Sequence, residues 1–178
     1  MLIQPIETQR LIIRQFEPQD WEAVHAYTGD AAVMTFVEEG QMSELQSKQF
    51  VETNSTDKAE AFPVVLKAQN QLIGHMIFHP WFGHLTYEIG WVFHPMYQGK
   101  GYATEAASAL LRYCFENLHG HRVIATCQPE NPVSYRVMEK IGMKREGYFR
   151  KGLYRGNNVW WDEYFYAILD EEWILDNG

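Results

Sequence analysis

The stretch that decides the fold is Tyr97-Gln98-Gly99-Lys100-Gly101-Tyr102-Ala103-Thr104-Glu105-Ala106, which carries two glycines and then opens directly into a helical pattern. Apolar residues follow at spacings of three and four, the period of an amphipathic helix: Ala103, Ala106, Ala107, Leu110, Leu111, Cys114 and Leu118. The run before it, Tyr87-Glu88-Ile89-Gly90-Trp91-Val92-Phe93, is typical of a strand and is closed by Pro95. A strand, a glycine turn and a helix start leave backbone N–H groups unpaired, with the positive end of the helix dipole behind them. The stretch therefore predicts an anion site, usually a phosphate site.

Two common phosphate-binding loops do not fit this turn. A Walker A loop needs Lys-Ser or Lys-Thr after its second glycine, and here Tyr102-Ala103 follows Gly101. The dinucleotide fingerprint needs a third glycine, which is missing. Considered alone, the turn also fits a glycine-eased connection that binds nothing, so the rest of the chain has to decide.

Length, composition and charge are those of an ordinary globular protein. The 178 residues, 46% hydrophobic and 21% charged, predict a single domain over residues 1–178. A net charge of −8 argues against a nucleic-acid partner or an anionic-membrane partner and is compatible with a cationic substrate such as an amine. Cys114 and Cys127 fall in apolar runs and are expected to be reduced core residues. Neither a signal peptide nor a membrane-spanning run is visible, so we expect a cytoplasmic protein.

Strand and helix patterns follow one another along the whole chain. Extended patterns cover residues 8–16, 60–67, 72–78, 85–93, 122–127, 144–154 and 159–169. Helical patterns cover residues 18–27, 31–37, 43–53, 99–118 and 131–141. Gly120 and Gly142 are expected to end the last two helices, and Gly156-Asn157-Asn158 is a hairpin signal. This order predicts a mixed α/β (α+β) sheet.

A second stretch identifies the loop. Asn131-Pro132-Val133-Ser134-Tyr135-Arg136-Val137-Met138-Glu139-Lys140-Ile141-Gly142-Met143 resembles the Asn-x-x-Ser/Ala-x-x-Φ-x-x-Lys-x-Gly-Φ signature of the GNAT acetyltransferase superfamily. The pattern Gln98-x-x-Gly101-x-Ala103 resembles that family's Gln/Arg-x-x-Gly-x-Gly/Ala loop. The opening Thr8-Gln9-Arg10-Leu11-Ile12-Ile13-Arg14 and the tail look closest to the branch of ribosomal-protein (Rim-type) N-terminal acetyltransferases. The resemblance implies the GNAT fold: a twisted, mostly antiparallel mixed sheet of about seven strands, flanked by about four helices and splayed between strands four and five.

By this resemblance the cosubstrate is acetyl-CoA, and no metal is implied; no metal-ligand spacing appears among the histidines. Backbone N–H groups of the glycine turn are expected to hold the pyrophosphate, and the cofactor-binding residues there are Gln98, Gly99, Lys100, Gly101, Tyr102, Ala103 and Thr104. In the family, strand four carries a bulge whose free backbone groups pair with the pantetheine arm and the thioester, here at Trp91, Val92 and Phe93. Asn131 matches the asparagine that contacts pantetheine, and it is also a good helix N-cap. Ser134 matches a serine near the sulfur in the Rim-type branch.

Glu88 and Ser134 are the candidate catalytic residues. We favour Glu88, on strand four, as the base that takes the amine proton through water, since burial raises the pKa of a carboxyl; a purely structural carboxylate stays open. Many family members carry, at the position of Met138, a tyrosine that protonates the leaving thiolate. Methionine has no proton to donate, so this departure moves the role to Ser134, to water or to Tyr135.

The reaction that the resemblance implies is direct acetyl transfer to an amine-bearing small molecule or to a protein N-terminus. Aromatic residues near the N-terminal helices and the tail hairpin predict an acceptor cleft with an apolar portion. Asp162 and Glu38 or Glu39 are candidate amine-binding acids. Leu153 stands where some Rim-type members carry an acid, which weakens any transfer of ribosomal-protein specificity. A non-catalytic acyl-CoA-binding sensor of the same fold stays open, and a homodimer is possible.

Overall fold

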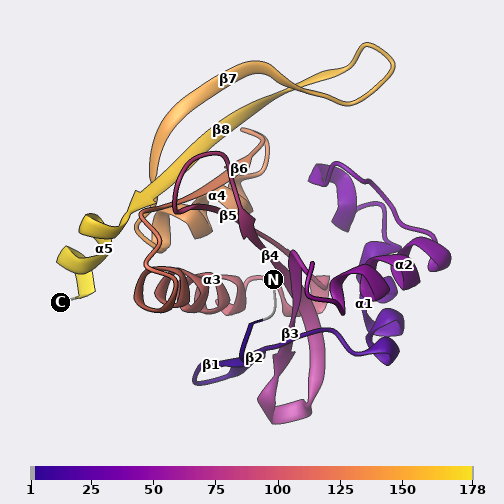
Figure 1. Ribbon diagram of the computed structural model, residues 1–178. Helices are drawn as coiled ribbons and strands as arrows, with labels where there is room; N and C mark the ends of the chain where they lie inside the picture. The colour runs from indigo at the N-terminus through magenta and orange to yellow at the C-terminus, as the bar shows by residue number, and fades with distance from the viewer. Residues whose placement is uncertain (1–2, 178) are drawn as a thin grey trace.

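One mixed sheet organises the protein. The computed structural model describes the backbone of residues 3–177 and the side chains of residues 3–173. Within these residues eight strands form a sheet in the order β1-β2-β3-β4-β5-β6-β8-β7 (Figure 1). Neighbouring strands are antiparallel except β5 and β6, which are parallel. The strands are β1 (Ile6–Glu7), β2 (Leu11–Ile13), β3 (Ala61–Leu66), β4 (Gln71–Pro80), β5 (Thr86–Phe93), β6 (Arg122–Cys127), β7 (Lys144–Tyr154) and β8 (Trp160–Leu169).

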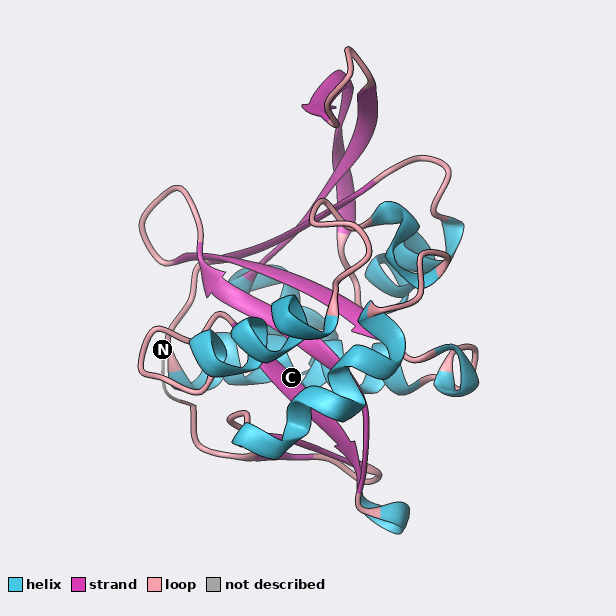
Figure 2. Ribbon diagram, turned by 90° about the vertical axis from the view of Figure 1, so that its right-hand side faces the viewer, coloured by secondary structure: helices cyan, strands magenta, loops and turns pink. Residues whose placement is uncertain are grey.

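The helices form two groups on opposite faces of the sheet (Figures 1 and 2). One face is covered by α1 (Trp21–Thr28) and α2 (Glu44–Asn54), and the other by α3 (Tyr102–Arg112) and α4 (Pro132–Lys140). A last helix, α5 (Asp170–Asn177), follows β8. Short 3₁₀ helices lie at Pro18–Asp20, Val33–Phe36, Lys67–Gln69 and Pro95–Tyr97, and a π turn lies at Tyr113–Asn117.

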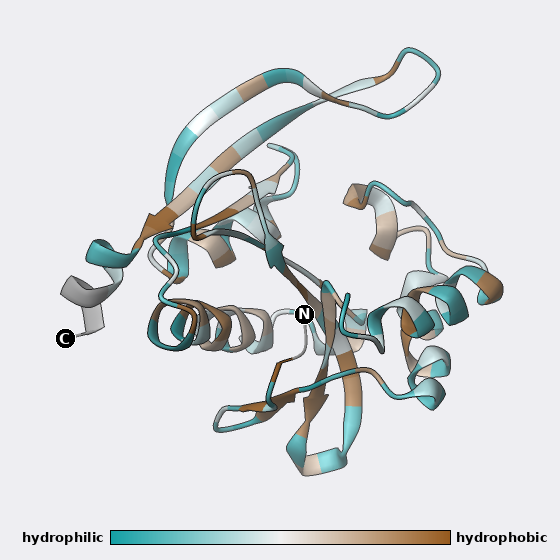
Figure 3. Ribbon diagram, viewed as in Figure 1, coloured by the Kyte–Doolittle hydropathy of each residue, from teal (hydrophilic) through white to brown (hydrophobic). Residues whose placement is uncertain are grey.

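Two apolar cores result, because side chains alternate between the two faces of a strand. Ile89 of β5 packs with Leu110 of α3 and Met138 of α4 in the larger core. Val92 of the same strand packs with Val24 of α1 in the smaller core. In Figure 3 the apolar colours gather along the central strands and α3, whereas the hairpin of β7 and β8 is largely polar. Odd-numbered β5 residues therefore face α3, and even-numbered ones face α1 and α2.

The sheet opens between its two parallel strands, as the resemblance implied. The β5–β6 register comprises Thr86↔Arg122, Tyr87↔Val123 and Glu88↔Ile124, whereas β5 continues to Phe93 and β6 to Cys127. The expected bulge of strand four is not where it was predicted. The β4–β5 register runs without a shift from Pro80↔Tyr87 to Gly74↔Phe93, and the irregularity lies one strand further out, between Val64 and Val65 of β3.

Most expected elements are present, and four differ. The helix expected at residues 31–37 is the short 3₁₀ helix Val33–Phe36. The extended run 8–16 is split into β1 and β2, because Thr8 forms a tight turn in which its hydroxyl accepts the Leu11 N–H at 2.9 Å. The helix expected at residues 99–118 begins at Tyr102, since Gly99 and Gly101 have φ of 72° and 80°, outside the helical region. It ends in the π turn, after which Gly120 N–H donates to Cys114 O at 3.0 Å. The tail helix α5 was not predicted.

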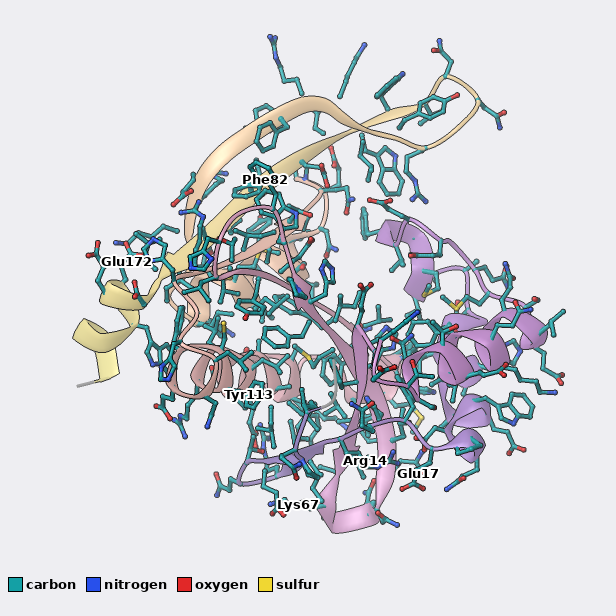
Figure 4. The ribbon with its side chains drawn as sticks, viewed as in Figure 1. Arg14, Glu17, Lys67, Phe82, Tyr113 and Glu172 are labelled. Atoms are coloured by element: carbon teal, nitrogen blue, oxygen red, sulfur yellow. The ribbon has the colours of Figure 1, made fainter. Side chains whose placement is uncertain are left out.

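The β7–β8 hairpin extends beyond the rest of the sheet and arches toward the side of α1 and α2 (Figure 1). Its turn contains Gly156, Asn157 and Asn158, all with positive φ, which is the chemistry the sequence predicted. In Figure 4 side chains project outward from the far end of the hairpin, and Phe82, from the loop between β4 and β5, lies below it. Over the residues that the structure describes, none of the helices has both the length and the apolar character needed to span a bilayer.

Candidate active site

The glycine turn between β5 and α3 forms an open helix start. The first bond within α3 joins Glu105 N–H to Gly101 O at 3.0 Å, so the N–H groups of Tyr102, Ala103 and Thr104 precede it and have no partner inside the helix. A Cβ placed on Gly99 meets no atom within 4 Å, so the backbone at this position is open to a ligand. Several free N–H donors at a helix N-terminus are the donor set that a pyrophosphate requires. The residues present therefore fit the pyrophosphate of CoA.

Arg10 and Glu105 brace this turn, which the sequence did not predict. The Glu105 carboxylate accepts from Arg10 Nε at 2.6 Å, from Arg10 N at 2.9 Å and from the Thr8 hydroxyl at 2.6 Å. Arg10 Nη1 also donates to Lys100 O at 3.1 Å, and the guanidinium lies 4.4 Å from the Tyr102 ring centroid. These contacts fix the turn to the segment before β2 and place the positive charge of Arg10 beside it. In the sequence, Thr8 and Arg10 belong to the opening Thr8–Arg14 run, which resembles the family but does not indicate a contact with Glu105.

Gln98 ties the turn to β5. Its Nε2 donates to Phe93 O at 2.8 Å, so the side chain is used structurally and the residue's backbone is what remains available to a ligand. Lys100 is exposed, and its Nζ lies 5.5 Å from the Tyr97 ring centroid. Its side chain lies beside Tyr97 at the turn, and Lys100 is not among the ion pairs of the described residues.

The backbone of β5 faces the opening of the sheet at alternate residues. His94 N–H donates to Ile73 O at 2.9 Å and Trp81 N–H donates to Thr86 O at 2.8 Å, so even-numbered β5 residues pair with β4. The N–H and C=O groups of Ile89, Trp91 and Phe93 consequently point toward β6, which has diverged. Of the three predicted positions, Trp91 and Phe93 face the opening. Val92 does not, because a strand alternates its bonding direction.

Asn131 and Ser134 lie where β6 ends, on the α3–α4 face. The Asn131 side chain accepts Ser134 N–H at 3.2 Å, so Asn131 is the helix N-cap that its residue type predicted. The Ser134 hydroxyl hydrogen-bonds the Cys127 thiol, whose pKa burial raises to about 12. Met138 is buried in the core beneath α4, with 1% of its surface exposed. The position that carries a tyrosine in many relatives is thus filled with apolar packing in this chain.

Glu88 lies on the other face of the sheet, at the last pair before β5 and β6 separate. Its Oε2 is 3.8 Å from His79 Nε2, directly across from it on β4. Burial raises the pKa of the Glu88 carboxyl; His79 opposes that rise, while Glu163 and Glu38 add to it. Burial, and then Glu38, also raise the pKa of Glu163, whose carboxylate accepts from the Thr126 hydroxyl.

Two further carboxylates on this side of the protein add to the rise in the pKa of Glu88: Glu38, from the loop before α2, and Glu163 of β8. Aromatic rings border them, with Phe36 and Trp161 at a centroid distance of 6.2 Å and Trp81 and Phe165 at 5.5 Å. The expectation of an acidic, partly apolar acceptor side is consistent with this arrangement. Glu163 was missed, because its neighbours come from strands far away in the sequence.

Asp162 has a different role from the one considered for it. Its carboxylate accepts from Lys151 N–H at 2.7 Å and from the Tyr148 hydroxyl, both within the hairpin. These bonds lower the pKa of the Asp162 carboxyl and close the bulged part of β7. Because β8 alternates, Asp162 points away from the face that carries Trp161 and Glu163.

A surface groove adjoins this site, since Thr8 and Glu105, which brace the turn, are among its lining residues. The groove has a volume of about 590 Å³ and lies between residues 4–9 and the outer side of α3, and no predicted site residue lines it. Among the residues described, no group of three or more His, Cys, Asp or Glu side chains is arranged to hold a metal ion.

The family model described as "Acetyltransferase (GNAT) domain" matches residues 10–144 of the chain. The chain is 58% identical to the uncharacterized N-acetyltransferase YnaD of Bacillus subtilis, over 94% of this chain and 98% of that protein. To the [ribosomal protein uS5]-alanine N-acetyltransferase of Escherichia coli it is 32% identical, over 51% of this chain and 44% of that protein.

Solved structures are similar over nearly the whole chain. A GNAT-family acetyltransferase from Bacillus anthracis has a TM-score of 0.91 and 57% identity, covering 94% of this chain and 99% of that one. A spermidine N-acetyltransferase from Vibrio cholerae, solved in complex with CoA and spermine, has a TM-score of 0.80 and 25% identity, covering 94% and 99%.

Proposed function

This chain belongs to the GNAT acetyltransferase family and is an acetyl-CoA-dependent N-acetyltransferase, and from that premise we propose that it acetylates a primary amine by direct attack on the thioester. The observation that carries the proposal is the placement of Glu88 and Ser134 on opposite faces of the sheet, on either side of the opening between β5 and β6. A base on one face and a hydroxyl on the other leave the opening between them for the thioester. Nothing in this arrangement requires a metal or an acyl-enzyme.

Acetyl-CoA supplies an activated acetyl group on a thiol that leaves readily. The N–H groups of residues 99–104 would hold its pyrophosphate, with Arg10 adding positive charge beside the turn. The outward backbone groups of Trp91 and the N–H group of Phe93, whose carbonyl oxygen already accepts from Gln98, would pair with the pantetheine arm. Asn131 would contact the arm from the start of α4. Holding one reactant by fixed backbone groups lowers the entropic cost of bringing it to the amine.

In the proposed reaction the amine nitrogen forms a bond to the acetyl carbon while the carbon–sulfur bond breaks. The ammonium form of the amine first gives one proton through water to Glu88. The nitrogen releases a second proton to water as it bonds to the acetyl carbon, and the CoA thiolate gains one proton from water or from the Ser134 hydroxyl, which water then reprotonates. A raised pKa suits Glu88 to this role, because a stronger base takes the proton of an ammonium more readily. General base catalysis of this kind contributes about 100-fold to 10,000-fold in rate.

The carboxylates around Glu88 favour a cationic acceptor. A small-molecule amine is the leading candidate, and the names of relatives point to spermidine in one case and to the N-terminal alanine of a ribosomal protein in another. The ribosomal branch is the weaker guide here. That similarity covers about half of each chain, and Leu153 stands where an acid was expected.

The proposal is tested by following thiol release from acetyl-CoA with a panel of butylamine, putrescine, spermine and alanine amide. We expect turnover with at least one amine and a loss of about 100-fold or more in kcat for Glu88→Gln. The matched control is Glu52→Gln on the exposed side of α2, which should leave kcat unchanged. Tight CoA binding without thiol release from any amine, and with no effect of Glu88→Gln, would instead favour the acyl-CoA-binding sensor.

A further inference from the structure

The tip of the β7–β8 hairpin makes one specific contact with the N-terminal half of the chain. Arg155 Nη2 donates to the carbonyl oxygen of Val37 at 3.0 Å, across 118 positions of sequence. The same carbonyl accepts Gly40 N–H at 3.1 Å, which closes a tight turn over residues 37–40. Gly40 takes φ of 66° to complete that turn. Arg155 thus binds the outer end of a turn whose central residues are Glu38 and Glu39.

Arg155 is itself held in place. Its guanidinium lies 4.1 Å from the Trp161 ring centroid, and Trp161 packs against Phe36 at 6.2 Å, so the ring is shared between the hairpin and the segment before the turn. The backbone of Arg155 is also fixed, because its N–H donates to Val159 O at 2.8 Å across the hairpin end. These contacts therefore join the β7–β8 hairpin to the loop between α1 and α2.

Glu38 is the residue that this contact orients. It follows Val37 directly, and the contact between Phe36 and Trp161 brings this segment to the face of β8 that also carries Glu163. The charge of Glu38 adds to the rise that burial causes in the pKa of Glu88 and of Glu163. No side-chain hydrogen bond from Glu38 is among the contacts of the described residues, so the turn's own position decides how near its carboxylate comes to Glu88. Backbone bonds to Met34 O and Thr28 O fix the two ends of this segment, and the bond from Arg155 to Val37 O joins it to the hairpin.

We propose that Arg155 is a positioning residue for the acceptor: by holding the 37–40 turn, it places the Glu38 carboxylate opposite Glu88, where an incoming ammonium group is bound before it loses its proton. The inference rests on the proposed function. It assigns a role to the hairpin tip, and it makes the affinity for the amine depend on a contact within the protein, between Arg155 and Val37 O.

The test separates binding from chemistry. With the panel amine of highest kcat/KM, Arg155→Ala should raise KM for the amine about 10-fold, leaving kcat and the KM for acetyl-CoA within twofold. Arg155→Lys retains a donor for Val37 O and should recover most of the loss. Arg150→Ala, which removes an exposed arginine from the same hairpin, is the matched control and should change none of these values.

Two further measurements distinguish positioning from general support of the fold. In Glu38→Gln the acid limb of the kcat/KM profile should move to lower pH, since a negative charge that raises the pKa of Glu88 is lost; His79 and Glu163, which also affect the pKa of Glu88, are unchanged. Arg155→Ala should shift that limb in the same direction. Adding Arg155→Ala to Glu38→Gln should then raise KM no further, because the two residues act as a unit.

The failures of the two proposals differ. If wild-type protein transfers acetyl groups but Arg155→Ala leaves the amine KM and the acid limb unchanged, or if its effect adds fully to that of Glu38→Gln, the role of Arg155 is refuted and the proposed function stands. If wild-type protein acetylates none of the four amines, the proposed function fails and the inference fails with it.

Discussion

At the scale of the residue, the pKa of Glu88 depends on groups that come from several parts of the chain. The place of Glu88 on a strand ahead of the glycine turn was predictable, because the extended pattern around it is clear. Its pKa direction was also expected from burial in a sheet. The groups that modulate it, His79, Glu163 and Glu38, were not expected together, since they come from β4, β8 and a loop. The chemistry proposed for Glu88 depends on all of them.

His75 is a second residue whose ionisation the fold controls. It is 3% exposed, and Tyr27 OH lies 2.7 Å from its Nδ1 in the core between α1 and the sheet. Burial lowers the pKa of His75 to about 4 from its ordinary value of 6.5. The unfolded chain therefore binds a proton more tightly than the folded one, so stability rises with pH between these two values and is lost as pH falls through them.

We predict that His75 accounts for roughly 3 kcal/mol of the stability lost between neutral pH and pH 4, by the linkage of 1.36 kcal/mol per pKa unit. His75→Gln should be less stable than wild type at pH 7 but should lose less stability on acidification. Urea unfolding at a series of pH values measures this. His84→Gln, at an exposed histidine of the β4–β5 loop, should keep the wild-type slope; an unchanged slope in His75→Gln would show that His75 is not the group responsible.

At the scale of the element, the turn and helix from Gln98 to Arg112 act as one unit. Gly101 is the N-cap of α3 and has φ of 80°, a conformation that a β-branched residue adopts only with strain. A side chain at this position also projects toward Arg10, whose Nη2 would lie 3.5 Å from the new Cβ. Glycine at this position therefore permits the left-handed backbone conformation. It also leaves the space beside the free N–H groups open to a ligand.

Gly101→Val should raise the KM for acetyl-CoA at least 10-fold while the protein still folds, with a loss of about 2 kcal/mol from left-handed backbone strain. Calorimetric titration with CoA and thermal unfolding measure the two effects separately. Gly156→Val is a matched control, because Gly156 has φ of 84° and open surroundings in the hairpin turn. It should show a similar loss of stability with normal CoA binding. Normal CoA binding by Gly101→Val would contradict the pyrophosphate assignment.

At the scale of the whole molecule, the sites proposed for the two reactants differ in charge. The CoA side is built around positive groups at the start of α3, whereas the acceptor side carries Glu38, Glu88 and Glu163 on a protein of net charge −8. Charge of one sign around a cleft raises the encounter rate of an oppositely charged ligand, and salt screens the effect over about 10 Å at 0.1 M. The two substrates should therefore respond differently to salt.

We predict that kcat/KM for the amine falls about 3-fold to 10-fold between low salt and 0.3 M sodium chloride, since screening removes the attraction of an ammonium group. For acetyl-CoA, an anion approaching an anionic protein, kcat/KM should stay level or rise. Initial rates with each substrate varied in turn give both values. A parallel fall for the two substrates would show that salt acts on the enzyme rather than on the encounter with the amine.

The homodimer that the family resemblance allows stays a prediction.

The sequence by itself determined the features that are written in contiguous residues. The β6 strand was predicted with its observed bounds, and the glycine turn, the Asn131 cap and the Gly156–Asn158 turn were all recognisable, because each depends on backbone preferences within a few positions. These local signals in their order were also enough for the family and for the sheet that goes with it. The boundaries of β1, β2 and α3 were less accurate, since turns and caps there override periodicity.

Only the tertiary structure decided which residues meet. Arg10 reaches Glu105 across 95 positions and Arg155 reaches Val37 across 118, and no local pattern encodes such a pairing. Strand register decided the rest: alternation places Trp91 and Phe93, but not Val92, on the opening, and Glu163, but not Asp162, on the acceptor side. Because a strand has a period of two, a shift of a single residue exchanges the two sets, and that register is set by packing across the whole sheet.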